Sequence, residues 1–445
     1  MMDALLLSRL QFAVTIAFHY IFPPLSIGLS LILVIMEGLY LKTGNLVYRV
    51  MTDFWLKVFA LTFALGVATG VVMEFEFGTN WSVFSRFVGD VFGSPLAAEG
   101  IFAFFLESVF LGVLLFGAGR VGKGLHFFST ICVAIGAHLS AIWIVVANSW
   151  MQTPAGFHIV THGNTTRAEI TDFWAMVFNP SAVDRVLHVY AGAWQAGAWL
   201  VVSVSAYYLL NKRHLDLAKR SLTIALIVAA LSSGVQLITG HSSALGAANH
   251  QPAKLAAFEG HYETNAPAAM YALGWVDEKN EKTYGVGVPG MLGLFLQGDL
   301  TAPVMGLRSF PKDLRPPVNI VFQAYHGMIL IGVGLILLIF FGLWFLHCGC
   351  LFETRWLLKL YVLSVLGPQS ANQLGWLAAE VGRQPWIVYN LLRTSDAFSK
   401  SVPAWQVLVS LGFFLMIYAL LFFLFIYLLD RKIKQGPEAH DVEVQ

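Results

Sequence analysis

The residues most able to do chemistry in this sequence are ionisable and polar side chains within long apolar stretches. Ionisable groups are costly inside a membrane, so each of these is a functional candidate. Glu99 and Glu107 are eight residues apart, a spacing that a helix places on one side, about 12 Å apart in height. Two such carboxylates suggest a proton relay. Ser140 and Asn148 repeat the spacing and could share the path, although polar residues there also serve as contacts between helices.

His19, His188 and Met328 carry side chains that ligate haem iron in proteins. His19 could instead form a hydrogen bond between helices. A His/Met pair holds a six-coordinate, electron-transferring haem, whereas a lone Met is commonly a core residue. Small residues that follow His188 would accommodate a flat ring or close helix packing. These small residues are Ala191, Gly192, Ala193 and Gly197.

A third set of candidates lies between Gly375 and Trp386, where Trp376, Glu380 and Arg383 occur together. A carboxylate can ligate high-spin haem iron and leave a position open to oxygen, and an arginine can hold a haem propionate. The structural alternative is a salt bridge at a helix end.

Two further pairs of charged residues are open to more than one interpretation. Glu74 and Glu76 form a Glu-x-Glu pattern that equally fits a solvated helix end. Lys254 and Glu259 lie five residues apart in a loop. Such a pair could bind a quinol headgroup and take its protons, or it could simply be solvated.

The composition indicates an integral membrane protein, because 57% of the 445 residues are hydrophobic and only 12% are charged. The net charge of +1 and the absence of a basic run argue against nucleic acid as a partner. The three cysteines form no Cys-x-x-Cys-His motif, so any haem is held non-covalently. Copper, iron–sulfur, flavin and nucleotide motifs are also missing from the sequence.

Apolar stretches of roughly 20 residues predict an all-α protein of nine transmembrane helices. They cover residues 11–37, 55–77, 95–117, 125–148, 184–210, 221–240, 319–346, 356–378 and 403–429. Thirteen basic residues lie on one side and six in the opposite short loops, which predicts an outward N-terminus and a cytoplasmic C-terminus.

The predicted organisation has four parts: helices 1–6 in residues 1–240, an outward loop at 241–318, helices 7–9 in 319–429, and a cytoplasmic tail at 430–445. A loop as long as 241–318 usually has a function. It includes a short stretch with helical character, from Pro252 to Tyr262.

Motifs in nearly the whole chain, in order, are similar to those of the haem-bearing large subunit of bd-type quinol oxidases. The Gly-Arg-Gln-Pro-Trp signature at 382–386 is the most specific of them. The others include Ser8-Arg9-Leu10-Gln11-Phe12, Gly66-Val67-Ala68-Thr69-Gly70, Phe77-Gly78-Thr79-Asn80-Trp81, Val146-Ala147-Asn148 and Lys254-Leu255-Ala256-Ala257.

The resemblance implies three haems: a low-spin haem b between His188 and Met328, a high-spin haem b, and haem d or a third haem b. It implies that His19 and Glu380 ligate the latter two, without deciding which serves which, and that Arg9, Trp376 and Arg383 belong to the haem-binding residues. Glu99 and Glu107 correspond to the haem-site carboxylates and the inner proton route. Lys254 and Glu259 correspond to quinol-binding positions.

Two departures from the family pattern stand out. The loop lacks a large C-terminal insertion and so resembles the short-loop branch, which includes cyanide-insensitive oxidases. His326 occupies a position where many relatives carry Arg. A neutral His would compensate haem propionates less than a guanidinium, so an altered haem potential is expected.

The resemblance implies a bacterial cytoplasmic (inner) membrane enzyme that oxidises ubiquinol or menaquinol outside and reduces O2 to water with protons from the cytoplasm. Glu107, Glu99, Ser140 and Asn148 would carry those protons, and this sidedness would generate a proton motive force without pumping. The partners implied are a second membrane subunit, a very small single-helix subunit and the lipid bilayer. The alternatives are a b-type cytochrome that only relays electrons and an ion transporter.

Overall fold

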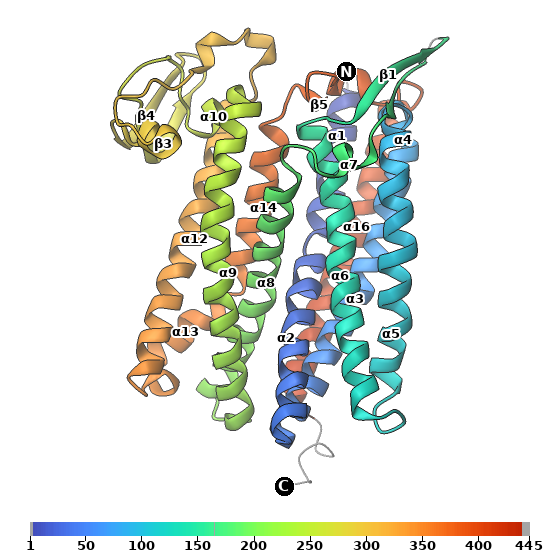
Figure 1. Cartoon of the computed structure of the whole chain (residues 1–445), viewed down its shortest axis with the longest axis vertical. Helices are drawn as coiled ribbons and strands as arrows, with labels where there is room; N and C mark the ends of the chain where they lie inside the picture. Colours follow the sequence, from blue (N-terminus) through green and yellow to red (C-terminus); the bar gives the residue numbers. More distant parts are fainter. Residues whose placement is uncertain (1–2, 164, 438–445) are drawn as a thin grey trace.

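The computed structural model describes residues 3–163 and 165–437, and it consists mainly of long helices that run side by side (Figure 1). The helices of the first half are α1 (Ala4–His19), α2 (Phe22–Thr43), α3 (Leu46–Thr79), α4 (Ser82–Ala98), α5 (Phe105–Phe116), α6 (Lys123–Gln152), α7 (Phe173–Val177) and α8 (Ala182–Leu210). Those of the second half are α9 (Leu215–His250), α10 (Pro252–Phe258), α11 (Met291–Gln297), α12 (Val318–His347), α13 (Arg355–Leu363), α14 (Leu366–Val381), α15 (Thr394–Ala397) and α16 (Ala404–Gln435).

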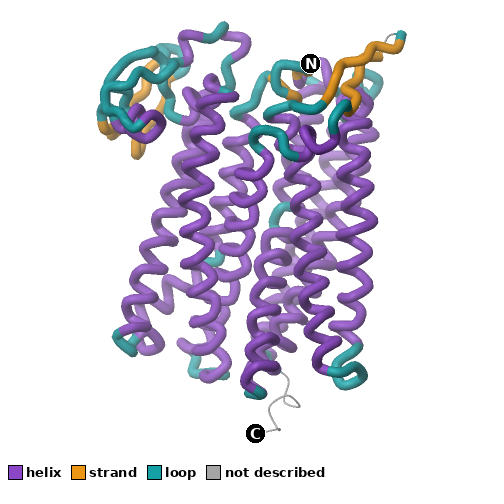
Figure 2. The backbone as a smooth tube through the Cα atoms, in the orientation of Figure 1, coloured by secondary structure: helices purple, strands orange, loops and turns teal. Residues whose placement is uncertain are grey.

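Three short antiparallel hairpins lie at one end of the helices, as the strands in Figure 2 show. Their strands are β1 (Phe157–His162) with β2 (Thr165–Ile170), β3 (Met270–Asp277) with β4 (Lys282–Val288), and β5 (Trp386–Val388) with β6 (Leu392–Arg393). None of these strands was predicted. The end of the bundle that carries the hairpins is called the loop end below.

Local sequence explains where the long helices begin and end. The Asp3 side chain accepts a hydrogen bond from the backbone N–H of Leu5 and caps α1. Pro23 and Pro24 occupy the first turn of α2, where their missing N–H groups cost nothing, so the first apolar stretch becomes two helices. Gly44 ends α2 in a left-handed conformation.

Two other predicted helices are interrupted. α4 and α5 are joined by a π-helical segment, Glu99–Phe104, that follows Pro95. The span predicted at 356–378 is broken at Ser364 into α13 and α14. The helix predicted at 221–240 is longer, because α9 continues to His250 and takes in the first ten residues assigned to the loop.

The long helices form two groups. α8, α9, α12 and α14 pack against one another, whereas α1, α3, α4, α5, α6 and α16 form the second group. α2 joins the groups, because it packs on α3 and α6 on one side and on α8 on the other. At the α2–α8 contact Gly28 meets Ala193 and Gly197, where an added Cβ on Gly28 would lie 2.3 Å from the Ala193 carbonyl oxygen.

Seven helical segments among the described residues are long and apolar enough to cross a membrane. They are Ala4–Thr43, Leu46–Thr79, Ser82–Phe116, Lys123–Gln152, Leu215–His250, Lys312–His347 and Ala404–Gln435. α8 and the broken pair α13–α14 stand beside them without being among the seven. Large apolar side chains such as Val333, Phe413 and Phe423 are exposed on the outer surface, as expected where helices face lipid.

Candidate functional site

Glu380 and Arg383 form an ion pair near the C-terminal end of α14, at the loop end of the bundle. Asn148 and Gln152, from the last turns of α6, each donate a hydrogen bond to Glu380 Oε1, at 3.0 and 3.2 Å. The Glu380 side chain remains 34% exposed, although both of its carboxylate oxygens accept hydrogen bonds. The structure thus joins Asn148 to Glu380, and not to the Ser140–Glu99 contact with which the sequence had grouped it.

Arg185 belongs to the same network and was not selected from the sequence, where it was counted only as a basic residue of a short loop. Its guanidinium donates to Asn148 Oδ1 and lies over the Trp376 ring, 5.5 Å from the ring centroid. Tyr20 packs edge-on against the other side of this cluster, 5.5 Å from Trp376. A positive charge three residues before His188, at the start of an apolar helix, was the signal that could have revealed it.

The Glu380 network suits an anionic group. Arg383 is 4% exposed, and its Nε and Nη1 atoms have no hydrogen-bond partner among the described residues. Arg185 Nε is also buried and has no hydrogen-bond partner among the described residues. Buried guanidinium groups bind a carboxylate strongly, and two guanidinium groups beside one carboxylate leave one positive charge uncompensated. These residues fit a haem, whose propionates are carboxylates.

His188 and Met328 lie in the group formed by α8, α9, α12 and α14. His188 Nε2 is 2.7 Å from Gln236 Nε2, and Nδ1 is 3.0 Å from Thr239 Oγ1, so α9 orients the ring. Met328 faces Gly375 on α14, where an added Cβ would lie 2.9 Å from the methionine sulfur. The glycine therefore makes room for the thioether.

His19 lies at the C-terminal end of α1 and faces α3. Its Nδ1 is 2.9 Å from Thr69 Oγ1, and an added Cβ on Gly70 would lie 3.3 Å from its Cε1 atom. Both contacts belong to the Gly66–Gly70 motif, so the motif forms the surface that receives the imidazole. Arg9 is half-buried, nearly three turns before His19 on α1.

Glu99 and Glu107 both face α6, as their spacing predicts. Ser140 donates a hydrogen bond of 2.5 Å to Glu99 Oε1. Glu107 is buried, and an added Cβ on Gly136 would lie 3.0 Å from the Glu107 Cβ atom. Glu99 is the first residue of the π-helical segment, a distortion that frequently occurs at functional sites.

The Glu74–Glu76 pattern divides into one exposed and one buried residue. Glu74 is exposed, whereas Glu76 is 1% exposed and accepts a 2.7 Å hydrogen bond from Thr15. The second oxygen of Glu76 has no partner among the described residues. A solvated helix end is therefore wrong for Glu76.

Lys254 and Glu259 are both buried but have different neighbours. Lys254 Nζ donates to the amide oxygens of Gln152 and Gln251, at 2.9 and 3.0 Å, and burial lowers the pKa of this amine well below its usual value. Glu259 has one unpartnered oxygen, and burial raises the pKa of its carboxyl to about 8. A solvated charged pair, the alternative from the sequence, is wrong for these residues.

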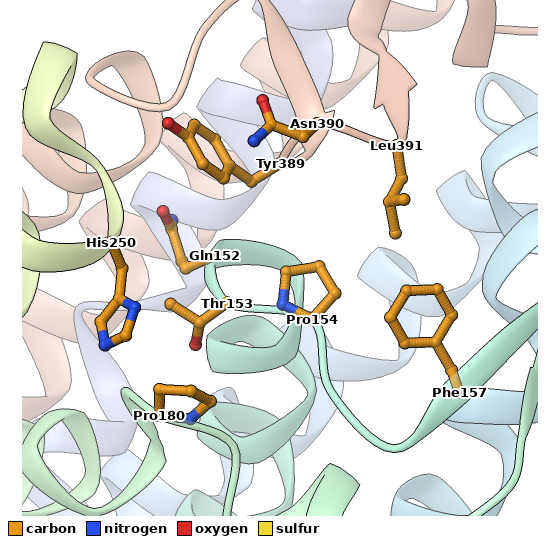
Figure 3. Close-up of a pocket in the computed structure, with 9 residues that line it drawn as sticks. All are labelled: Gln152, Thr153, Pro154, Phe157, Pro180, His250, Tyr389, Asn390 and Leu391. Carbon is orange, nitrogen blue, oxygen red and sulfur yellow. The ribbon is translucent and has the colours of Figure 1, made fainter.

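Two hollows open at the loop end beside Lys254. One, of about 240 Å³, is lined by Lys254, Arg383, Gln384, Trp386 and Phe310 among others. The second, of about 340 Å³, is surrounded by residues of α6, α9 and the β5–β6 turn (Figure 3). Tyr389 and Asn390 line both, and Gln152 joins the second hollow to Lys254 and Glu380 through its hydrogen bonds.

His326 is buried and connects α12 to the loop. Its Nε2 atom is 2.7 Å from the carbonyl oxygen of Tyr271 in β3, and its Nδ1 atom is 2.9 Å from that of Phe322. The imidazole therefore contacts backbone in both directions and has a structural role. Its expected effect on a haem potential stays a prediction.

Comparisons with known proteins identify the family of this chain. Residues 7–437 match the family described as cytochrome bd terminal oxidase subunit I. The chain is 39% identical to cytochrome bd ubiquinol oxidase subunit 1 of Bacillus subtilis (strain 168), over 100% of this chain and 97% of the relative. It is 35% identical to cytochrome bd-II ubiquinol oxidase subunit 1 of Escherichia coli (strain K12), over 100% and 99%.

The fold has a close counterpart among solved structures. The structure of bd oxidase from Geobacillus thermodenitrificans superimposes with a TM-score of 0.90 at 29% identity, covering 98% of this chain and 99% of that one. Sequence and fold thus agree over essentially the full length. The chain therefore belongs to the cytochrome bd terminal oxidase subunit I family, the family of the terminal quinol oxidases.

Proposed function

We propose that this chain is the haem-bearing subunit of a quinol:oxygen oxidoreductase that reduces O2 to water with electrons from quinol. The observation that carries the proposal is the chain of contacts at the loop end, in which Gln152 links Lys254 to Glu380. The quinol site at Lys254 and the haem site at Glu380 would then be connected through the hydrogen bonds of Gln152.

Four residues would hold haem iron: His188 and Met328 one haem, His19 and Glu380 one each of two others. Bound haem supplies electron transfer and the reduction of oxygen, chemistry that no side chain of the chain can perform. Arg383 and Arg185 would pair with propionates through their unpartnered N–H groups, with the Trp376 ring against Arg185. Arg9 stays a proposed haem-binding residue on the family resemblance. Two b-type haems and a haem d, or a third haem b, are the set we propose.

Quinol would bind at the loop end beside Lys254 and Glu259. Lys254 Nζ already contacts two amide oxygens and would form a further hydrogen bond with a quinol hydroxyl. Glu259, with a pKa raised to about 8, would take a proton when it is ionised. Both protons would leave at the loop end, in the direction of the two hollows.

Protons for water would arrive from the opposite end of the bundle. Glu107, Glu99 and Ser140 lie along one side of α6 and would pass them towards the haem site, with Asn148 at Glu380 as the last polar contact. Uptake at one end and release at the other would separate charge across the membrane without pumping.

We further propose nine membrane crossings, counting α8 and the α13–α14 pair with the seven apolar segments. The loop end would face outward and the end rich in Lys and Arg the cytoplasm of a bacterium, following the bias of basic residues. A second membrane subunit, and a small single-helix one, would complete the enzyme. Assay of the complex with ubiquinol and with menaquinol identifies its substrate.

A visible difference spectrum of the purified complex, reduced minus oxidised and repeated with carbon monoxide, tests the proposal. We expect b-type bands and a separate far-red band that carbon monoxide shifts. A carbon-monoxide-sensitive b haem without the far-red band would keep the oxidase and replace haem d. A haem spectrum that carbon monoxide does not change would favour a cytochrome that only relays electrons. The absence of any haem band would overturn the proposal.

A further inference from the structure

The β3–β4 hairpin of the long loop has one face made of large apolar side chains that contact little else. Leu273 pairs with Val286 and Trp275 with Tyr284 across the two strands, which places these four on one face with Val288 beyond them. All five are at least half exposed, from 50% at Tyr284 to 71% at Val286. A soluble loop would rarely leave such a face in water.

The free edge of β3 and the opposite face of the hairpin are fastened along the first turns of α12. Asn319 accepts from the Val276 backbone N–H at 3.1 Å, and Gln323 donates to the Gly274 carbonyl oxygen at 2.8 Å. Further along, His326 contacts the Tyr271 carbonyl oxygen. Gly274 permits this approach, because an added Cβ would lie 3.2 Å from the Phe322 ring. The hairpin is thus held at a definite height on the helix.

These contacts place the hairpin beside the first turns of α12, at the loop end of a segment long and apolar enough to cross a membrane. Asn319 and His326 are seven residues apart, or about 10 Å along α12. The following helix, α11, contacts the neighbouring α9, where the Phe295 ring is 5.2 Å from that of His241. His241 precedes the end of α9 by nine residues, or about 13 Å. Figure 1 shows the hairpin at the side of the bundle, level with the helix ends.

The polarity of the hairpin changes along the axis of α12, from Asn319 towards His326. Its turn, Asp277 to Lys282, is polar and lies next to Asn319 at the start of α12. The Trp275–Tyr284 pair comes next, with the Lys282 amine 5.1 Å from the Tyr284 ring centre. The aliphatic Leu273, Val286 and Val288 lie deepest. Water, aromatic belt and hydrocarbon follow one another in the same order across a membrane interface.

We propose that the β3–β4 hairpin and α11 lie in the interfacial region of the bilayer leaflet at the loop end, where lipid covers the apolar face and water still reaches the free backbone edge of β4. Ile320 of α12 is also exposed, next to Asn319, which holds the hairpin. Lipid is favoured over a protein partner because the gradient from polar turn to aliphatic edge runs parallel to α12, a helix long and apolar enough to cross a membrane. The proposal depends only on the chain spanning a membrane.

The test uses the whole oxidase complex in lipid nanodiscs, without added quinol, and spin labels at single cysteines. Cys132, Cys348 and Cys350 are first replaced by Ser, after which Val286→Cys or Val288→Cys is labelled with a nitroxide. Collisions with oxygen, which dissolves in hydrocarbon, and with a water-soluble nickel chelate are measured by power saturation. Val333→Cys on the exposed surface of α12 serves as the lipid reference and Lys279→Cys, in the hairpin turn, as the water reference.

We expect labels at 286 and 288 to collide with oxygen more than with the chelate, as the Val333 label does, and the Lys279 label to show the reverse. Chelate access at 286 and 288 equal to that at 279 would place the face in water and overturn the proposal. Protection from both reagents would also overturn it, because a protein surface would then cover the face. Two labelled positions keep the test valid if one variant assembles poorly.

Discussion

Several residues that we grouped by their spacing in the sequence have different partners in the structure. Ser140 contacts Glu99, whereas Asn148 contacts Glu380 and Arg185, so two residues eight positions apart on one helix serve two parts of the site. Lys254 and Glu259 likewise point to different neighbours. The chemistry of each residue follows from its burial and its partners, and several expectations can be tested one side chain at a time.

Glu259 should give quinol oxidation a pH dependence. Below a pH of about 8 its carboxyl is protonated and cannot accept a proton from quinol, and above it the carboxylate can, so kcat/KM should rise with pH and level off beyond 8. Glu259→Gln should remove the rise and lower kcat/KM at high pH by about a hundredfold, a usual contribution of a general base. Glu263→Gln, at an exposed ion pair with Arg308, is the control. An unchanged profile in Glu259→Gln would refute the assignment.

Met328→Leu should convert a six-coordinate low-spin haem into a five-coordinate one, because leucine fills similar space but has no sulfur to ligate iron. We expect a high-spin signal in the electron paramagnetic resonance and visible spectra and at least a tenfold loss of kcat, equivalent to about 1.4 kcal/mol. Met416→Leu, at an exposed position on α16, should change neither. A native spectrum in Met328→Leu would exclude the methionine as a ligand.

At the scale of elements, the two helix groups meet where backbone approaches backbone. Ala193 and Gly197 of α8 receive Gly28 of α2, the helix that joins the two groups, whereas Gly192 faces Asn372 of α14 within one group. Of the two interpretations of the small residues after His188, the structure shows close helix packing. The π-helical segment between α4 and α5 is a second feature of the elements that bears on the site, since it begins at Glu99.

Gly28→Ala should destabilise the contact between α2 and α8. The added Cβ would lie 2.3 Å from the Ala193 carbonyl oxygen and 2.7 Å from the Gly197 nitrogen, both backbone atoms that move only with their helix. Overpacking of this kind costs about 1–3 kcal/mol, so the Tm of the purified complex should fall by several degrees. Gly234→Ala in α9, which meets nothing within 4 Å, should leave it unchanged. Equal Tm values for both variants would contradict the packing argument.

At the scale of the molecule, all three hairpins and the Lys254 and Glu380 contacts lie at the loop end, and the basic loops lie at the other. Quinol chemistry and proton uptake are thereby assigned to opposite ends. The orientation of the whole chain in the membrane decides which end meets the cytoplasm.

Cysteine labelling should establish that orientation. Cys348 is exposed just after α12, at the end opposite the hairpins. A membrane-impermeant maleimide should label it in inside-out vesicles and not in intact spheroplasts. Lys279→Cys with the native cysteines replaced should show the reverse pattern. Labelling of Cys348 from the outside would invert the proposed topology.

The sequence by itself determined the membrane class, the family and most of the helices, because each depends on local composition or on a linear pattern of residues. Hydropathy finds a spanning helix since backbone groups in lipid must bond within their own segment. The same patterns missed the breaks at Ile21 and Ser364 and all six strands, which depend on where a neighbouring element packs.

Only the tertiary structure decided which polar residues meet. Arg185, Gln152 and Glu76 acquire roles because residues from helices far apart in the chain converge on them, such as the pair formed by Gln152 and Glu380. The apolar face of β3–β4 became apparent for the same reason, since a strand with alternating glycines carries little hydrophobic signal until its other face is packed against α12. Spacing along one helix predicts which side a residue faces, whereas burial and partners are set by what packs against that side.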